Sequence, residues 1–228
     1  FTIAEKVIMV LEGSNPTAMA KTTGLGVLEL ANVFYNLQPD AVVTIADRFE
    51  TIATSIAAAY QNIPLIHIQG GEVTGNIDEK TRHANTKFAD LHLVSSDNAR
   101  NRVIKMGEDP DTVLNTGCPS IDLARLVVEN PEMDFDPIQK YGGVGSPLQW
   151  ENGYIVVMQH PETNRYEQAK SDITATIKAV HESGIPAFWF WPNVDSGADG
   201  TSNGIRSYRE LHQPENIHFF KNMEPLDF

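Results

Sequence analysis

Short runs of β-branched residues alternate with helical stretches along most of this 228-residue chain. In the first half we expect strands at 7–11, 41–45, 64–68, 91–95 and 113–114, and helices at 18–37, 49–60, 78–89, 97–106 and 121–128. In the second half we expect strands at 154–158, 186–191 and 217–220, and helices at 164–183 and 204–211. This alternation predicts an α/β fold built from βαβ units, with doubly wound parallel sheets.

Residues 129–153 interrupt the alternation with several prolines and a glycine cluster at Gly142, Gly143 and Gly145. Proline and glycine favour turns and loops, so we interpret 131–153 as a linker or crossover. The expected domains are a Rossmann-like domain at 1–130, incomplete at its start, and a second one at 154–228, incomplete at its end. On this interpretation the chain is the middle portion of a longer protein.

Composition limits the partners of the chain. The net charge of −13 argues against nucleic acid and anionic membranes as general partners. No apolar run approaches the roughly 20 residues that a membrane-spanning helix needs. The single cysteine, Cys118, allows no internal disulfide and fits a reducing compartment, so we expect a cytoplasmic protein. In the sequence TGCPS that thiol has no evident activating neighbour, and we expect it to be buried and inert.

The run LIHIQGGEVTGNIDEKTRHANTK, residues 65–87, carries the densest chemistry. An apolar strand leads into Gly70-Gly71, acidic and polar residues follow (Glu72, Thr74, Asn76), and Asp78 opens a helix with Arg82 and His83. A strand, a glycine turn and a helix N-terminus together form a common anion site. Carboxylates beside cations in one loop add the groups for proton transfer. The alternative is a solvated turn followed by a salt-bridged helix.

Other candidates follow the remaining strands, because ligands of doubly wound sheets bind at the carboxyl ends of the strands. They are Glu12-Gly13-Ser14, Asp47-Arg48, Ser95-Ser96, Gly117, His160, and Asn193 with Asp195. Asp47 and Asp78 have a second interpretation as helix caps, with Asp78 paired to Arg82 one turn on. Basic residues also gather in one stretch, either as an anion patch or as solvated helix faces: Lys80, Arg82, Lys87, Arg100, Arg102 and Lys105.

Five motifs together resemble the UDP-N-acetylglucosamine 2-epimerase family. They are DRFET (47–51), HIQGGEVTGNIDEKTRHANTK (67–87), MGEDPDTVLNTGCPSID (106–122), QHPET (159–163) and WPNVDSG (191–197). The closer resemblance is to the hydrolysing branch, which starts the synthesis of sialic and related nonulosonic acids. It implies a two-domain, glycosyltransferase-B-like fold with the substrate in the cleft.

The resemblance also implies roles for individual residues. It makes Asp47, Glu72, Asp78 and His160 the catalytic candidates, with His160 facing the nucleotide diphosphate. The implied substrate contacts are Arg48, Gln69, Gly70, Gly71, Arg82, His83, Asn193 and Asp195. Gln69 is a departure, because many relatives carry a catalytic glutamate there and an amide cannot take a proton from carbon. Either Glu72 supplies the carboxylate, or Asp78 does more of the work, or this sub-branch differs.

The function that this resemblance implies is hydrolysis of UDP-N-acetylglucosamine to N-acetylmannosamine and UDP, by elimination of UDP and hydration of a glycal. We expect no cofactor and no metal, since His67, His83 and His92 have no convincing ligand arrangement. We also expect a homo-oligomer, either a dimer or a tetramer. The alternatives are a UDP-2,4-diacetamido-trideoxyhexose substrate, a non-hydrolysing epimerase, a glycosyltransferase of the same fold, and a non-catalytic nucleotide-sugar-binding module.

Overall fold

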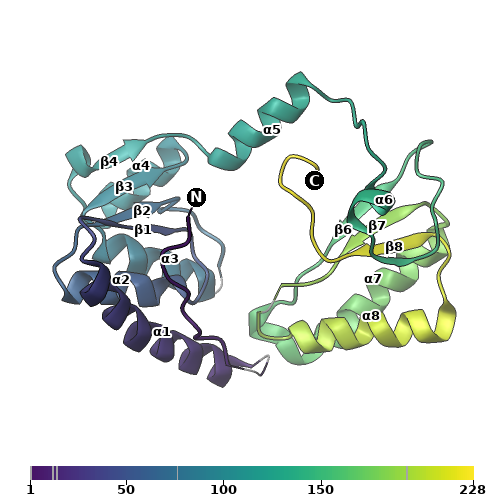
Figure 1. The fold of residues 1–228 in the computed structure, drawn as a ribbon, viewed down its shortest axis with the longest axis horizontal. Helices are drawn as coiled ribbons and strands as arrows, with labels where there is room; N and C mark the ends of the chain where they lie inside the picture. Colours follow the sequence, from purple (N-terminus) through teal and green to yellow (C-terminus); the bar gives the residue numbers. More distant parts are fainter. Residues whose placement is uncertain (1, 12, 14, 76, 194) are drawn as a thin grey trace. The chain divides into compact units, whose positions relative to one another are not determined.

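The structure is a computed structural model that describes residues 2–11, 13, 15–75, 77–193 and 195–228. Two compact units are distinguished by their internal contacts, one ending at Asp122 and the other containing Leu123–Phe228 (Figure 1). The candidate residues Glu12, Ser14 and Asn76 lie outside the described residues.

The first unit is a parallel sheet with the strand order β1-β2-β3-β4, whose strands are joined by helices. Its strands are β1 (Val42–Ile45), β2 (Leu65–Ile68), β3 (Leu91–Val94) and β4 (Val113–Asn115). Its helices are α1 (Pro16–Leu37), α2 (Thr51–Tyr60), α3 (Ile77–Phe88) and α4 (Asp97–Lys105), with a short turn η1 (Pro110–Thr112) before β4. The helix α5 (Pro119–Glu129) follows, and the division between the units falls inside it.

One face of this sheet forms the core of the first unit. Val42 and Leu65 pack with Phe34 and Ala58 of the helices α1 and α2, and Val94 and Val113 pack with α4. The opposite face is more open, since Val43, Ile45 and Leu114 are each about half exposed. The strand ends are therefore held by helices packed on one face, and this arrangement brings the loops after β1, β2 and β3 to one edge.

The expected strand at 7–11 is wrong. Residues 7–11 have no strand partner, and Ile8 is 91% exposed. The segment instead lies against α1, where the Leu11 amide donates to Thr22 Oγ1 at 3.0 Å. Alternation of apolar residues predicts a strand only where a neighbouring strand can take up its backbone hydrogen bonds.

The second unit has the strand order β5-β8-β7-β6, parallel except for the antiparallel edge strand β5. Its strands are β5 (Val144–Gly145), β6 (Ile155–Met158), β7 (Ala187–Phe190) and β8 (Ile217–Phe220). Its helices are α6 (Pro137–Tyr141), the 3₁₀ segment η2 (Thr163–Gln168), α7 (Ala169–Ser183) and α8 (Ala198–His212).

Both faces of this second sheet are covered. Trp189 and Phe219 pack with Ile173 and Ile205 of α7 and α8, and Trp191 packs at the margin of that core. On the other face Phe188, Phe190 and Phe220 pack against residues of 138–150. The segment 131–153, expected as a linker, thus carries α6 and β5 and contributes side chains to this core. The predicted α/β class with parallel sheets is confirmed in both units.

Gly71 shows why the chain turns so closely after β2. It has a positive φ of 83°, and a Cβ there would lie 2.5 Å from the backbone oxygen of Ala99 on α4. Its own carbonyl oxygen accepts a hydrogen bond from Arg102 of the same helix. This glycine is required by the close approach of loop and helix, in addition to any contact with a ligand.

We expect Gly71→Ala to lower the free energy of unfolding by about 2–4 kcal/mol, from the left-handed backbone and the overlap with α4 together. Gly75→Ala is the matched control, because Gly75 also has a positive φ, 74°, but faces open space. It should cost only about 1 kcal/mol. Urea denaturation of the two variants measures the difference, and equal losses would contradict the packing argument.

Candidate functional site

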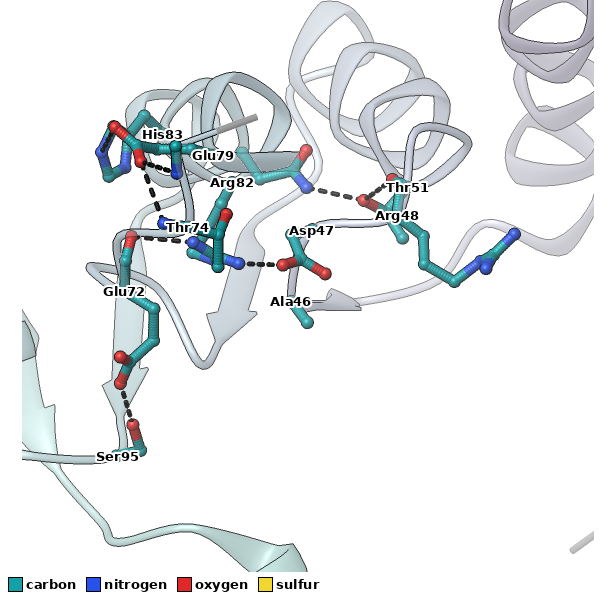
Figure 2. A network of polar contacts seen from close by, with 12 residues as sticks. Ala46, Asp47, Arg48, Thr51, Glu72, Thr74, Glu79, Arg82, His83 and Ser95 are labelled. Atoms are coloured by element: carbon teal, nitrogen blue, oxygen red, sulfur yellow. Dashed lines mark hydrogen bonds and ion pairs between the residues drawn. The ribbon is translucent and has the colours of Figure 1, made fainter. Parts of the chain in front are cut away.

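A buried arginine joins the loops that follow β1 and β2. Arg82 on α3 is 3% exposed, and its Nη1 donates to the carbonyl oxygen of Glu72 at 2.8 Å. Its Nη2 forms an ion pair with the carboxylate of Asp47, and Figure 2 shows the guanidinium between these two loops. Burial lowers the pKa of Arg82 from its ordinary value. A guanidinium nevertheless stays charged in proteins, so this cation needs the Asp47 carboxylate.

This ion pair changes the interpretation of Asp47. Asp47 does not cap α2, because that helix begins at Thr51 with Glu50 in the N-cap position. In the structure Arg82 forms an ion pair with Asp47, across two loops. Arg48, next to Asp47, pairs with Glu50 at 2.7 Å and extends away from Arg82 (Figure 2).

Glu72 connects the same loop to the end of a third strand. Its Oε1 accepts a hydrogen bond from Ser95 Oγ at 2.6 Å, and Ser95 directly follows β3 (Figure 2). Asp47, Glu72 and Ser95 therefore gather at the carboxyl ends of β1, β2 and β3. From the sequence Ser95 was a candidate only because it follows an apolar strand. That position is the one sequence signal for its contact with Glu72.

Glu79, which the sequence analysis did not select, holds the loop in place. Its Oε2 accepts from the backbone amides of Thr74 at 2.9 Å and Gly75 at 2.7 Å. These hydrogen bonds, above all the one from Gly75, lower the pKa of the Glu79 carboxyl. His83, expected beside the substrate, has its Nε2 3.9 Å from Glu79 Oε1. Glu79 therefore acts on the loop itself, and His83 lies beside Glu79 on the same helix (Figure 2).

Asp78 lies inside α3, as the second residue of a helix that begins at Ile77. Because α3 already includes Asp78, the residue does not precede the helix as its cap. A carboxylate in the first turn is stabilised by the positive end of the helix dipole. The position also places Asp78 at the start of the helix that carries Arg82.

Gln69 occupies an unusual backbone position at the end of β2. Its φ is +62°, in the left-handed region that few residues other than glycine adopt. Its side-chain amide donates to Cys118 Sγ at 3.3 Å. Unusual backbone of this kind occurs preferentially at binding sites. The Gln69 side chain thus contacts a thiol on a different loop.

The expectation that Cys118 is buried is wrong. The residue is partly exposed and directly precedes α5. Hydrogen bonds from the backbone amides of Ile121 and Ser120, at the start of that helix, lower the pKa of the thiol. The activating neighbour was therefore a helix N-terminus that the sequence TGCPS did not reveal to us.

Most side chains of the basic stretch at 80–105 contact other groups of the protein. Arg100 donates to the carbonyl oxygens of Val113 and Pro110, and Lys87 pairs with Glu108. With Arg82 and Arg102, four of these side chains hold loops in place. The interpretation of this stretch as a patch for a nucleotide diphosphate loses support accordingly.

The second unit has a polar cluster of its own at the ends of β6 and β7. The backbone amide of Asn193 donates to His160 Nδ1 at 3.1 Å, so this nitrogen is an acceptor and a neutral ring carries its proton on Nε2. The side chain of Asn193 donates to Asp195. The three predicted residues of this unit therefore lie together, with His160 exposed.

Neither a metal centre nor a membrane segment is found in the described part of the chain. No group of three or more His, Cys, Asp or Glu side chains there is arranged to hold a metal ion. No helix among the described residues combines the length and apolar character of a membrane span.

The family model for UDP-N-acetylglucosamine 2-epimerase matches residues 1–228. The chain belongs to this family. It is 28% identical over 241 residues to "UDP-N,N'-diacetylbacillosamine 2-epimerase (hydrolyzing)" of Legionella pneumophila, covering 99% of this chain and 60% of that protein. It is 31% identical over 204 residues to "Polysialic acid biosynthesis protein P7" of Escherichia coli, covering 87% of this chain and 50% of that one. The chain therefore spans about half to three-fifths of these curated relatives.

Solved 2-epimerase structures share the fold. The enzyme of Neisseria meningitidis bound to UDP-GlcNAc aligns over 96% of this chain and 58% of its own, at a TM-score of 0.67 and 18% identity. The enzyme of Methanocaldococcus jannaschii, in complex with UDP-GlcNAc and UDP, aligns over 92% of this chain and 57% of its own. The TM-score is 0.69 and the sequence identity is 13%. The expected fold class, glycosyltransferase-B-like with Rossmann-like units, is confirmed.

The Asp47–Arg82 pair should contribute strongly to stability. Asp47→Asn removes the charge that balances a buried guanidinium and should lower the free energy of unfolding by about 3 kcal/mol. Arg125→Gln is the control, because the pair of Arg125 with Glu129 is exposed and should contribute only about 0.3–0.5 kcal/mol. Similar losses in the two variants, measured by urea denaturation, would show that Arg82 does not depend on Asp47.

The thiol of Cys118 should react as a partly activated nucleophile. Because its pKa lies below that of an ordinary cysteine, the thiolate fraction grows at lower pH in the folded chain than in the unfolded one. Alkylation by iodoacetamide, followed by mass spectrometry, should reach half its maximal rate at a lower pH in buffer than in urea. Coincident pH profiles would contradict the effect of the helix terminus.

Proposed function

We propose that the protein containing this chain is a hydrolysing UDP-sugar 2-epimerase, which releases UDP and a free 2-epimeric sugar. One observation carries the proposal: Arg82 joins the loops that hold the carboxylates of Asp47 and Glu72 at the ends of neighbouring strands, in a family of 2-epimerases with hydrolysing members. The proposed enzyme uses no metal and no cofactor, and works as a dimer or tetramer in the cytoplasm.

The proposed chemistry is elimination followed by hydration. A base removes the C2 proton of the 2-acetamido sugar while UDP leaves C1, which gives a glycal. Water then adds a hydroxyl to C1, and C2 receives a proton on the opposite face. This route needs a base near C2 and donors for the departing diphosphate.

The described residues can supply these parts. Glu72 and Asp78 take the proton-transfer roles in our proposal, because the amide of Gln69 cannot accept a proton from carbon. Asp47 balances and orients the Arg82 guanidinium, and the loops that this pair joins form part of the binding surface for the substrate. In the second unit His160 and Asn193 provide donors for the diphosphate, and Asp195 orients Asn193 by accepting from its side-chain amide.

We propose UDP-N-acetylglucosamine as substrate, which gives N-acetylmannosamine for sialic acid synthesis. A UDP-2,4-diacetamido-trideoxyhexose is the second candidate, because hydrolysing relatives from Legionella pneumophila and Campylobacter jejuni are named for diacetylbacillosamine.

The test is to incubate the full-length protein with each UDP-sugar and to separate the products. The proposal expects UDP and a free 2-epimeric sugar in equal amounts, and the preferred substrate identifies the sugar. An equilibrium of two UDP-sugars without free sugar would instead indicate a non-hydrolysing epimerase. Binding of the UDP-sugar without any turnover would indicate a non-catalytic module.

Asp78→Asn should lower kcat by about 10²-fold or more if Asp78 transfers protons. The amide keeps the shape of the side chain and its place in the first turn, so stability should change by only about 1 kcal/mol. Asp109→Asn is a matched control, because Asp109 caps the short η1 turn before β4. A near-normal kcat in Asp78→Asn would return Asp78 to a structural role.

A further inference from the structure

His67 contacts both elements that form the Asp47–Arg82 pair. The residue lies on β2 and is fully buried. Its Nε2 is 3.0 Å from the carbonyl oxygen of Ala46, the residue before Asp47. Its Nδ1 is 3.1 Å from Thr86 Oγ1 on α3, one turn after Arg82. The imidazole therefore spans from the turn that carries Asp47 to the helix that carries Arg82.

The turn at Ala46 needs such an anchor. Ala46 has a φ of +56°, a left-handed conformation that costs an alanine free energy. Its amide donates to the Ile68 carbonyl oxygen at 2.8 Å, and its carbonyl oxygen faces His67. Both polar groups of this residue are thus held by β2, and this sets the direction in which the chain continues into Asp47.

The contacts also define the proton positions on the ring. A carbonyl oxygen can only accept, so Nε2 must carry a proton to bond with Ala46. In the neutral ring Nδ1 is an acceptor, and the one proton of the Thr86 hydroxyl is shared between this nitrogen and the carbonyl oxygen of Arg82, each 3.1 Å from Thr86 Oγ1. Burial, and to a smaller extent the neighbouring His92 and His83, lowers the pKa of His67 to about 4. At neutral pH the ring is therefore an uncharged donor toward the Asp47 turn.

Gly70 is shaped by the same contact. A Cβ at Gly70 would lie 2.9 Å from Thr86 Oγ1 and 3.0 Å from His67 Nδ1. The first glycine of the double-glycine turn thus lets the backbone pass directly over the histidine–threonine pair. A side chain at position 70 would displace this pair.

We propose that His67 is a positioning residue, which holds the Ala46 turn so that the Asp47 carboxylate meets Arg82. This proposal rests on the proposed function for its effect on turnover. His67 does not touch the reacting atoms in this account. It acts through the orientation of Asp47, and a small displacement of an organising group can cost about 10²-fold in rate.

The matched pair His67→Gln and His67→Asn tests this. The Gln amide can place an N–H near the position of Nε2 and keep the bond to Ala46, whereas the shorter Asn reaches only toward Thr86. In the full-length protein we expect kcat to fall at least tenfold in His67→Asn and to stay within about threefold of wild type in His67→Gln. Equal kcat values in the two variants would overturn the proposal.

A buried histidine on the next strand is the control for stability. His92 on β3 is 1% exposed, pairs in register with His67, and faces Glu108 at 3.5 Å. His92→Asn should lower the unfolding midpoint as His67→Asn does, but should leave kcat within about threefold of wild type. A loss of kcat that follows the midpoint in both variants would reduce His67 to a structural residue.

A spectroscopic test separates this proposal from the proposed function, because it needs no substrate. Nitrogen NMR of the imidazole at pH 7 should show the proton of His67 on Nε2 and none on Nδ1. The signals should change only as pH falls toward 4, since burial, and to a smaller extent His92 and His83, disfavours a second proton. A proton on Nδ1 would overturn the proposal, whereas an inactive wild type with the expected signals would contradict the proposed function alone.

Discussion

The buried Arg82 guanidinium is the constraint on which the rest of the site depends. A guanidinium that is only 3% exposed needs a compensating charge and hydrogen-bond acceptors. The Asp47 carboxylate supplies the charge, and the Glu72 carbonyl oxygen is a second acceptor. These partners come from loops after two different strands. Compensation of the buried Arg82 charge therefore holds both loops in place. Glu72, oriented in this way, reaches Ser95 after a third strand.

The backbone is strained at two strand ends, and this strain helps to orient the side chains of the site. Ala46 and Gln69 follow β1 and β2 directly, and both adopt left-handed conformations. Each is held by hydrogen bonds to the neighbouring strand, from Ala46 to Ile68 and from Gln69 to Leu93. Strain of this kind persists where the surroundings over-determine it, as functional loops often do. It directs Asp47 toward Arg82 and Gln69 toward Cys118.

Periodicity in the sequence predicted nearly all helices and strands, because apolar alternation and turn residues are local signals. It failed at 7–11, where the deciding factor was the absence of a partner strand. Motifs selected the candidate site residues, but could not indicate which of them pair. Arg82 binds Asp47, 35 positions away, and Cys118 gains its activation from the start of α5. Such relations depend on how loops pack, which local pattern does not record. His67 looked like an ordinary strand residue for the same reason.

The central claim is that this site moves a proton at C2 while UDP leaves C1, and solvent isotopes test it most directly. Turnover by the full-length protein in D₂O should place deuterium at C2 of the free sugar. Turnover in H₂¹⁸O should place the label at C1 and none in UDP, when read before the free sugar exchanges its C1 oxygen with water. Label in UDP would mean attack at phosphorus, and free sugar without deuterium at C2 would mean that no solvent proton enters there. Either result would contradict the account.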